Sequence, residues 1–310
     1  NTSIQNPHKP YRLLTGDTVG YAARWPAEGT AAPQRHNWII RRDPLIVVSG
    51  DLPAWGLMAA ERGPTVSPPF FVYALVRARV IVDGQTCWLD ETKALEVQYH
   101  PWCSEHRLTL PGGLHLTIAC TAWQNRGAML QFRVEGPLPA TAELLVEVQG
   151  LGTAAQSTSA SFVKQELVVW HPGQSQAEGV RASMRGTIST SVVDAADTYG
   201  PGGFAMPPQR AIELEASAGR WEALPDQRLL LRLPLAEGAV HEIGLVVGRD
   251  GSEPRFPGFA AAEEETREHY RHVLSLCHSR TPDARLDAAL AAAVVSLDQG
   301  RDGKAWLEGV

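Results

Sequence analysis

The stretch FFVYALVRARVIVDGQTCWL (residues 70–89) decides the fold class of this chain of 310 residues. Apolar and β-branched side chains dominate from Phe70 to Val82, which is typical of a strand. The pair Asp83-Gly84 then gives a strong signal for a tight turn between two antiparallel strands. Because Cys87-Trp88-Leu89 comes where a returning strand should be, these residues predict a β-hairpin.

The same pattern continues on both sides of this hairpin. Short runs of alternating or apolar residues recur from Trp38 to Val247, and the 28 Gly and 22 Pro of the chain provide turns between them. About a dozen strands of this kind predict a mainly β fold, a large antiparallel β-sandwich of the supersandwich type over residues 1–255. One large double-sheet domain is favoured over two small ones, since no Cys-Trp-Cys spacing marks an immunoglobulin-sized module.

The pattern changes to helical after Phe256. Residues 260–278 carry acidic residues in the early turns and basic ones later, a polarity that complements a helix dipole. We expect a linker helix within residues 256–280. Its apolar stripe consists of Tyr270, Val273, Leu274 and Cys277.

A second helix is expected within residues 281–310, with Thr281 as N-cap and Pro282 at the first helical position. Apolar residues at spacings of 3, 4 and 7 give it one apolar side. These residues are Leu286, Ala289, Leu290, Ala293, Val294 and Leu297.

This apolar side needs something to pack against. We expect Leu286, Leu290, Val294 and Leu297 to bind either a further C-terminal helical domain or a second copy of the chain. Residues 281–310 would then be the first helix of a truncated α-helical domain.

Composition excludes several classes of protein. The net charge of −6 gives no basic surface for nucleic acid, and no run of about 18 apolar residues could span a membrane. The polar N-terminus lacks the apolar stretch of a signal peptide, and four scattered cysteines make no disulfide framework. We therefore expect a cytoplasmic protein, or a periplasmic or secreted one if a signal peptide has been removed.

Motifs for catalysis or cofactor binding are absent. The sequence has no P-loop, no dinucleotide-binding glycine pattern and no serine-hydrolase elbow. His100, Cys103 and His106 lie close together, but they lack a fourth zinc ligand, and a turn between strands is the favoured interpretation. We expect no catalytic residue, no cofactor and no metal site.

Tryptophan offers the one candidate for ligand binding, because sugar rings stack on aromatic side chains. Of nine Trp, Trp55 and Trp102 lie near predicted turns and are the candidate carbohydrate-binding residues. The alternative is that each ring is partly buried and closes one end of the sandwich. Trp88 and Trp170 lie in apolar strands and are expected in the core.

The order of these elements resembles a known family. It is similar to the N-terminal β-sandwich of bacterial glycoside hydrolases whose catalytic part is an (α/α)6 barrel, such as glucoamylase-like and glycogen-debranching-like enzymes. The resemblance is loose over the whole chain and closer over about the last 60 residues. The residues that carry it are Leu235-Ala236-Glu237-Gly238, Glu242 to Gly248, Tyr270 and Leu274, Thr281 to Leu290, and Ser296-Leu297-Asp298-Gln299.

This resemblance implies the non-catalytic part of a glycoside hydrolase that acts on oligosaccharides or α-glucan-like substrates. In that family the sandwich supports the barrel and can shape one rim of the sugar cleft, whereas the paired carboxylates needed for hydrolysis lie in the barrel. No catalytic role is therefore carried over to Asp298, Asp302 or Glu308. The alternatives are a stand-alone carbohydrate-binding, lectin-like module and a purely structural sandwich.

Overall fold

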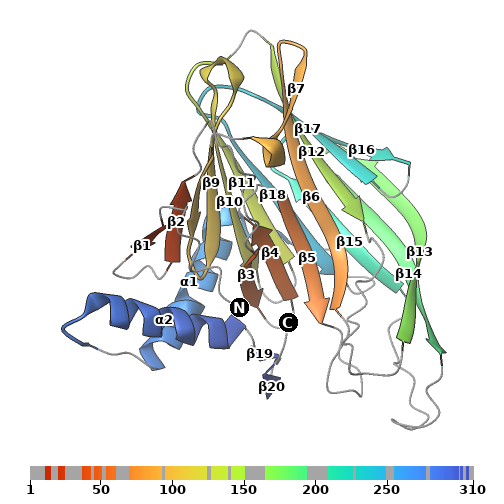
Figure 1. Cartoon of the computed structure of the whole chain (residues 1–310). Coiled ribbons are helices and arrows are strands. Elements are labelled where there is room, and N and C mark those ends of the chain that lie inside the picture. The colour runs from red at the N-terminus through yellow and green to blue at the C-terminus, as the bar shows by residue number, and fades with distance from the viewer. Residues whose placement is uncertain are drawn as a thin grey trace.

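Two large antiparallel sheets, of ten and eight strands, make up most of the molecule (Figure 1). They are followed by two helices, which confirms the predicted fold class of a mainly β sandwich with C-terminal helices. The computed structural model describes residues 11–14, 20–24, 37–42, 45–50, 54–60, 70–92, 95–123, 127–138, 141–150, 165–193, 209–225, 228–248, 255–276, 280–299, 301–302 and 305–306.

The larger sheet joins strands from the whole length of the sandwich. Most neighbours in it are also neighbours in sequence, but β18 lies between β11 and β15 and connects two halves of the sheet. In spatial order its strands are β1 (Tyr11–Leu14), β2 (Gly20–Arg24), β8 (Leu95–Tyr99), β9 (Cys103–Thr109), β10 (His115–Trp123), β11 (Gly127–Glu135), β18 (Val240–Gly248), β15 (Gln209–Ala216), β14 (Arg181–Val193) and β13 (Gln165–Glu178).

The smaller sheet contains the hairpin predicted from the sequence. Val82 pairs with Gln85, and both turn residues have positive φ, 47° at Asp83 and 80° at Gly84. This is the turn geometry that matches the twist of antiparallel strands, so the hairpin is confirmed. The strands in spatial order are β16 (Arg220–Leu224), β17 (Arg228–Pro234), β12 (Ala142–Gly150), β6 (Phe70–Val82), β5 (Ala54–Ala60), β4 (Leu45–Gly50) and β3 (Asn37–Arg42), with β7 (Gln85–Trp88) paired to β6.

Alternate residues of the strands fill the space between the two sheets. On β12, Leu144, Val146 and Val148 are fully buried, and on the opposite sheet Ile118 and Phe132 are buried against the same core. Burying a side chain of this size stabilises the fold by about 1.5–3 kcal/mol relative to leaving it exposed. The alternation read from the sequence is therefore what holds the two sheets together.

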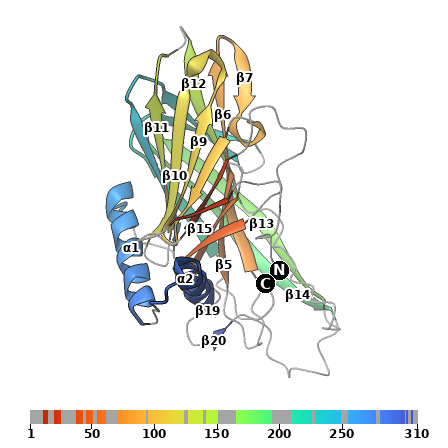
Figure 2. The same ribbon diagram turned by 60° about the vertical axis from the view of Figure 1, so that its left-hand side comes forward.

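The first helix, α1 (Phe259–Leu276), lies along the outer face of the larger sheet (Figure 2). Its buried residues follow helical spacing and include Tyr270 and Val273, as predicted, whereas Cys277 lies outside the described residues. Near its start, Phe259 and Ala262 pack on an apolar patch of the sheet. That patch consists of Ala119, Trp123, Met129 and Val246.

The second helix, α2 (Ala284–Gln299), begins two residues later than predicted. The backbone carbonyl of Asp283 accepts the first helical bond, from the N–H of Leu286 at 3.0 Å, so Asp283 is the N-cap. The hydroxyl of Thr281 instead accepts the N–H of Asp283 at 3.2 Å and forms a local turn before the helix. The prediction of Thr281 as N-cap and Pro282 as the first helical residue was wrong for this reason.

The side of α2 that faces the sandwich is not the one with the most leucines. Val295 is buried and Ala291 is partly buried, whereas Leu286 and Leu297 are 57% and 56% exposed. The remaining predicted contacts, Leu290 and Val294, are partly buried. The stripe predicted to pack is thus mainly turned away from the sandwich, and the division of the chain at residues 255 and 280 stays a prediction.

Two short 3₁₀ helices and a two-stranded ribbon complete the described elements. They are η2 (Leu89–Glu91), η3 (Pro111–Gly113), β19 (Arg301–Asp302) and β20 (Ala305–Trp306). Within the part of the chain that the structure describes, no helix has the length and apolar character needed to cross a membrane.

Candidate functional site

The N-terminus of α1 is fixed to the sheet by a carboxylate from β18. Glu242 accepts a hydrogen bond from the backbone N–H of Phe259 at 3.1 Å, while its other oxygen accepts one from Gln131 at 2.9 Å. Gly258, with φ +85°, turns the chain into the helix directly before this contact. A negative charge at a helix N-terminus is favourable, so Glu242 both caps and positions α1.

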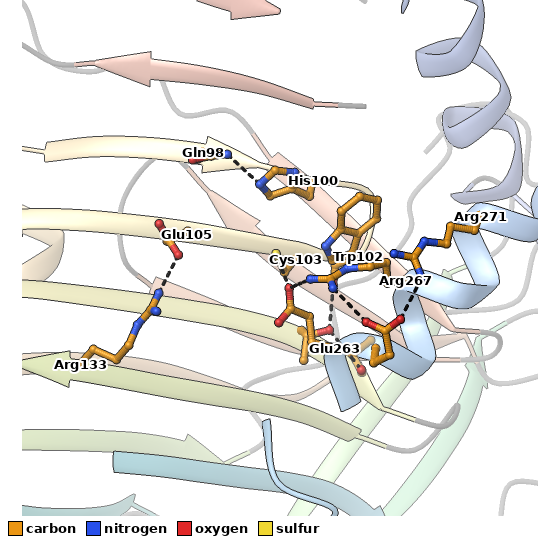
Figure 3. A network of polar contacts seen from close by, with 12 residues as sticks. Gln98, His100, Trp102, Cys103, Glu105, Arg133, Glu263, Arg267 and Arg271 are labelled. Atoms are coloured by element: carbon orange, nitrogen blue, oxygen red, sulfur yellow. Dashed lines mark hydrogen bonds and ion pairs between the residues drawn. The ribbon is translucent and has the colours of Figure 1, made fainter. Parts of the chain in front are cut away.

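A network of polar contacts continues along the same helix (Figure 3). Arg267 donates hydrogen bonds to Glu263 at 2.5 Å and Glu264 at 2.8 Å, and its guanidinium lies 5.3 Å from the ring centre of Trp102. The ring of His100 also stacks on Trp102, with the two ring planes 14° apart. These contacts join α1 to the turn between β8 and β9.

Burial shifts the pKa values of two groups in this network, Cys103 and His100. It raises the pKa of the Cys103 thiol well above its usual value, and the carboxylates of Glu263 and Glu105 add to that effect. Burial also lowers the pKa of His100, with Glu105 opposing the shift and Arg267 adding to it. A protonated thiol is a poor nucleophile, so Cys103 does not suit covalent catalysis.

Two residues of the His-Cys-His cluster point in opposite directions. Cys103 packs on Tyr270 at the outer face of the larger sheet, whereas His106 is buried between the sheets and meets Trp55 edge to face at 5.8 Å. Alternation along β9 separates them, so these two side chains cannot share a metal ion. Among the described residues, no group of three His, Cys, Asp or Glu side chains is arranged to hold one.

Both candidate carbohydrate-binding tryptophans are buried in this structure. Trp55 is 4% exposed and lies between the sheets, where it also meets Phe132 edge to face at 6.2 Å. Trp102 is 3% exposed and lies under α1 and α2 with Tyr270 and Val295. Neither indole offers an open face to a sugar, so their role in carbohydrate binding stays a prediction that would need local opening.

Trp88, expected in the core, lies instead at the outer face of the smaller sheet. The guanidinium groups of Arg77 and Arg79 lie 4.2 and 4.7 Å from its ring centre. Arg77 also pairs with Asp90 at 2.8 Å. The expectation was wrong because Trp88 pairs with Arg79 on β6 and shares that residue's outward direction. Trp170 has no described side chain.

A separate cavity of about 520 Å³ lies where the edge strands of the two sheets meet, at β13 and β16. The indole N–H of Trp221 donates to the carbonyl of Val180 at 3.1 Å, and its backbone N–H donates to Gly179 at 2.9 Å. These bonds hold β16 against the turn between β13 and β14. The residues around the cavity are Ala177, Arg220, Trp221, Glu222, Ala223 and Arg232.

The sequence did not single out any residue of this cavity. Its walls come from β13, β16 and β17, which lie far apart in the chain or in different sheets. Only the pairing of Arg220 with Arg232 across two strands, seen in the structure, places the two guanidinium groups at one rim. A pair of arginines twelve positions apart gives no such signal in the sequence alone.

Comparison with known proteins gives a distant likeness. No family model and no curated protein sequence matches this chain. Among solved structures, a family GH92 inverting mannosidase from Bacteroides thetaiotaomicron is similar, with 11% identity and a TM-score of 0.33. The match covers 93% of this chain and 33% of that one, so this chain spans about a third of that enzyme's length.

Proposed function

We propose that this chain is the N-terminal, non-catalytic part of a glycoside hydrolase that acts on oligosaccharides or α-glucan-like substrates. In this proposal the sandwich supports a catalytic helical domain and can shape one rim of its sugar cleft. The order of units supports it: a large antiparallel sandwich, a helix lying on that sandwich, and then a second, amphipathic helix. The resemblance carried by residues 281–299 implies the same order.

The observation that carries the proposal is the exposed apolar side of α2. Leu286 and Leu297 are three helical turns apart and therefore lie on the same side of the helix, about 16 Å apart along its axis. Each of the two leucines is more than half exposed, and Ala289 and Ala293 between them are exposed as well. Such a line of apolar side chains suits the packing of a further helix.

The opposite side of α2 is held firmly against the rest of the molecule. The imidazole of His269 on α1 lies 2.9 Å from the carboxylate of Asp298 on α2. Val295 packs beside this contact on Trp102 and Tyr270. The sandwich and α1 thus fix the direction of α2, which is the task expected of a supporting domain.

The test combines the gene with an activity assay. We expect an open reading frame that continues past the codon of Val310 into helical repeats, and we expect its full-length product to hydrolyse oligosaccharides. The 310-residue chain alone should release no sugar from the same substrates. Hydrolysis by the isolated chain would contradict the non-catalytic role, and a stop codon at Val310 would contradict the supporting role.

The same assay distinguishes the supporting role from the lectin-like alternative. A chain that ends at Val310 and binds oligosaccharides without hydrolysing them would be a stand-alone carbohydrate-binding module. The burial of Trp55 and Trp102 disfavours that alternative at these two residues, because a sugar needs one open face of an indole ring.

A further inference from the structure

The cavity between β13 and β16 has a chemical character that the proposed supporting role does not use. Its charged lining consists of two cations, Arg220 and Arg232, and one anion, Glu222. Its other walls come from Ala177, Ala223 and Trp221. A volume of about 520 Å³ lies within the range of small-molecule sites and is much larger than a single inorganic ion requires.

Arg220 is the residue that stands out at this cavity. Strands β6, β16 and β17 carry five arginines, and four of them pair with described carboxylates. Their ion pairs are Arg77 with Asp90, Arg79 and Arg228 with Glu147, and Arg232 with Glu143. Within the described residues, Arg220 has no such carboxylate.

Arg220 is exposed and lies beside a second cation. Arg220 lies directly opposite Arg232 on the neighbouring antiparallel strand, and like charges in that position repel. Glu222 lies 3.8 Å from Arg232 and balances the positive charge of that residue. An anion bound beside Arg220 would relieve the remaining repulsion.

The backbone around the cavity is fixed, so the site is formed before a ligand arrives. Trp221 is 2% exposed and holds β16 by its two hydrogen bonds to the turn between β13 and β14. Gly219, with φ +87°, lies so close to the carbonyl of Arg232 that a Cβ there would be only 2.3 Å from it. A rigid frame of this kind lowers the entropy cost of binding.

We infer that this cavity binds a small acidic saccharide, with its carboxylate on Arg220 and its ring against Ala177 and Ala223. A guanidinium can bind a carboxylate through two parallel hydrogen bonds, which a neutral sugar cannot form. The carboxylate is inferred from the charges around the cavity. That the ligand is a saccharide rests on the proposed function. The walls of the cavity by themselves require only a small molecule with one apolar face.

Titration calorimetry of the 310-residue chain with D-glucuronate tests this inference, with D-glucose as the neutral match. We expect saturable binding of glucuronate and at least about tenfold weaker binding of glucose, the order of effect of a charged hydrogen bond. Inorganic phosphate should bind more weakly than glucuronate. Absence of glucuronate binding, or equal binding of glucose or phosphate, would overturn the inference.

Two variants and a control locate the site. Arg220→Gln should weaken glucuronate binding about tenfold or more, and Ala223→Leu should do the same by filling the cavity. Arg181→Gln is the matched control, because Arg181 pairs with Glu215 on the other sheet and does not line the cavity. Circular dichroism checks that each variant is folded, and wild-type affinity in a folded Arg220→Gln variant would refute the assignment.

The result of the glucuronate titration is independent of the test of the supporting role. Glucuronate binding depends on β13, β16 and β17, whereas the supporting role depends on the protein segment that the gene encodes after α2. Failure of the titration would therefore leave the role of the sandwich in place, and a stop codon at Val310 would leave the cavity and its ligand in place.

Discussion

The hydroxyl of Thr266 donates a hydrogen bond of 2.9 Å to the backbone carbonyl of Ala122 and ties the middle of α1 to strand β10. Thr266 is fully buried, so this bond forms inside the apolar contact between helix and sheet. Apolar surfaces alone would let the helix slide along the sheet, since their attraction has little direction. A buried, directional bond fixes its position.

Replacing this hydroxyl tests its contribution. Thr266→Val keeps the shape of the side chain but leaves the carbonyl of Ala122 without its donor from α1, so we expect a loss of about 1–3 kcal/mol in the free energy of unfolding. Urea denaturation followed by circular dichroism measures it. Thr86→Val, at an exposed position on β7, is the control, and an equal effect of both substitutions would refute this role.

The close contact between Gly244 and Phe256 gives a second prediction. A Cβ at Gly244 would lie 2.0 Å from the ring of Phe256, so Gly244→Ala must displace that ring from the sheet. We expect a cost of about 1–3 kcal/mol in unfolding free energy. In a Phe256→Ala background the same change should cost much less, and additive effects in this double-mutant cycle would contradict the explanation.

His100 makes stability depend on pH in a defined direction. Because burial lowers its pKa in the folded state, the unfolded chain binds a proton first as the pH falls below about 6.5. The contribution of neutral, buried His100 to the free energy of unfolding is therefore fully present above that pH. It decreases as the pH falls toward the lower pKa of the folded state. We expect the fall in urea midpoint between pH 7.5 and pH 5 to be smaller in His100→Gln than in wild type.

A control histidine separates this effect from general acid destabilisation. His272 is exposed on α1, so His272→Gln should retain the pH dependence of the wild type. If both histidine variants show the same pH dependence as wild type, the stacked position of His100 on Trp102 does not control stability in this range.

The two sides of α2 should respond differently to substitution in the isolated chain. Leu286→Gln and Leu297→Gln change exposed side chains, so each should alter the unfolding free energy by less than about 0.5 kcal/mol. Val295→Ala removes buried methyl groups and should cost about 1–3 kcal/mol. Large losses at the two leucines would show that they are already covered in solution, for example by a second copy.

The fold could be predicted from the sequence wherever the pattern is local. The recurring strands and the Asp83-Gly84 turn depend only on neighbours in the chain, and both predictions are confirmed. The start of α2 was misplaced because Thr281 has two local uses, as a helix cap and as a turn former. Sequence alone does not rank these two.

The site could not be predicted, because it depends on which faces meet in space. Helical spacing predicts one apolar side of α2, and the sequence does not show that Ala291 and Val295 pack on the sandwich while Leu286 stays exposed. Trp55 lies near a predicted turn yet is buried, because the second sheet covers it. Arg220 became a candidate only through its register with Arg232.

The position of β18 between β11 and β15 has a consequence for the order of folding. More than a hundred residues separate β11 from β18 in the chain, so during synthesis the two halves of the larger sheet wait for residues 240–248 before they can join. Contacts between such distant segments form slowly. Until then β11 and β15 each expose an unpaired edge, and such edges can pair with other chains and favour aggregation.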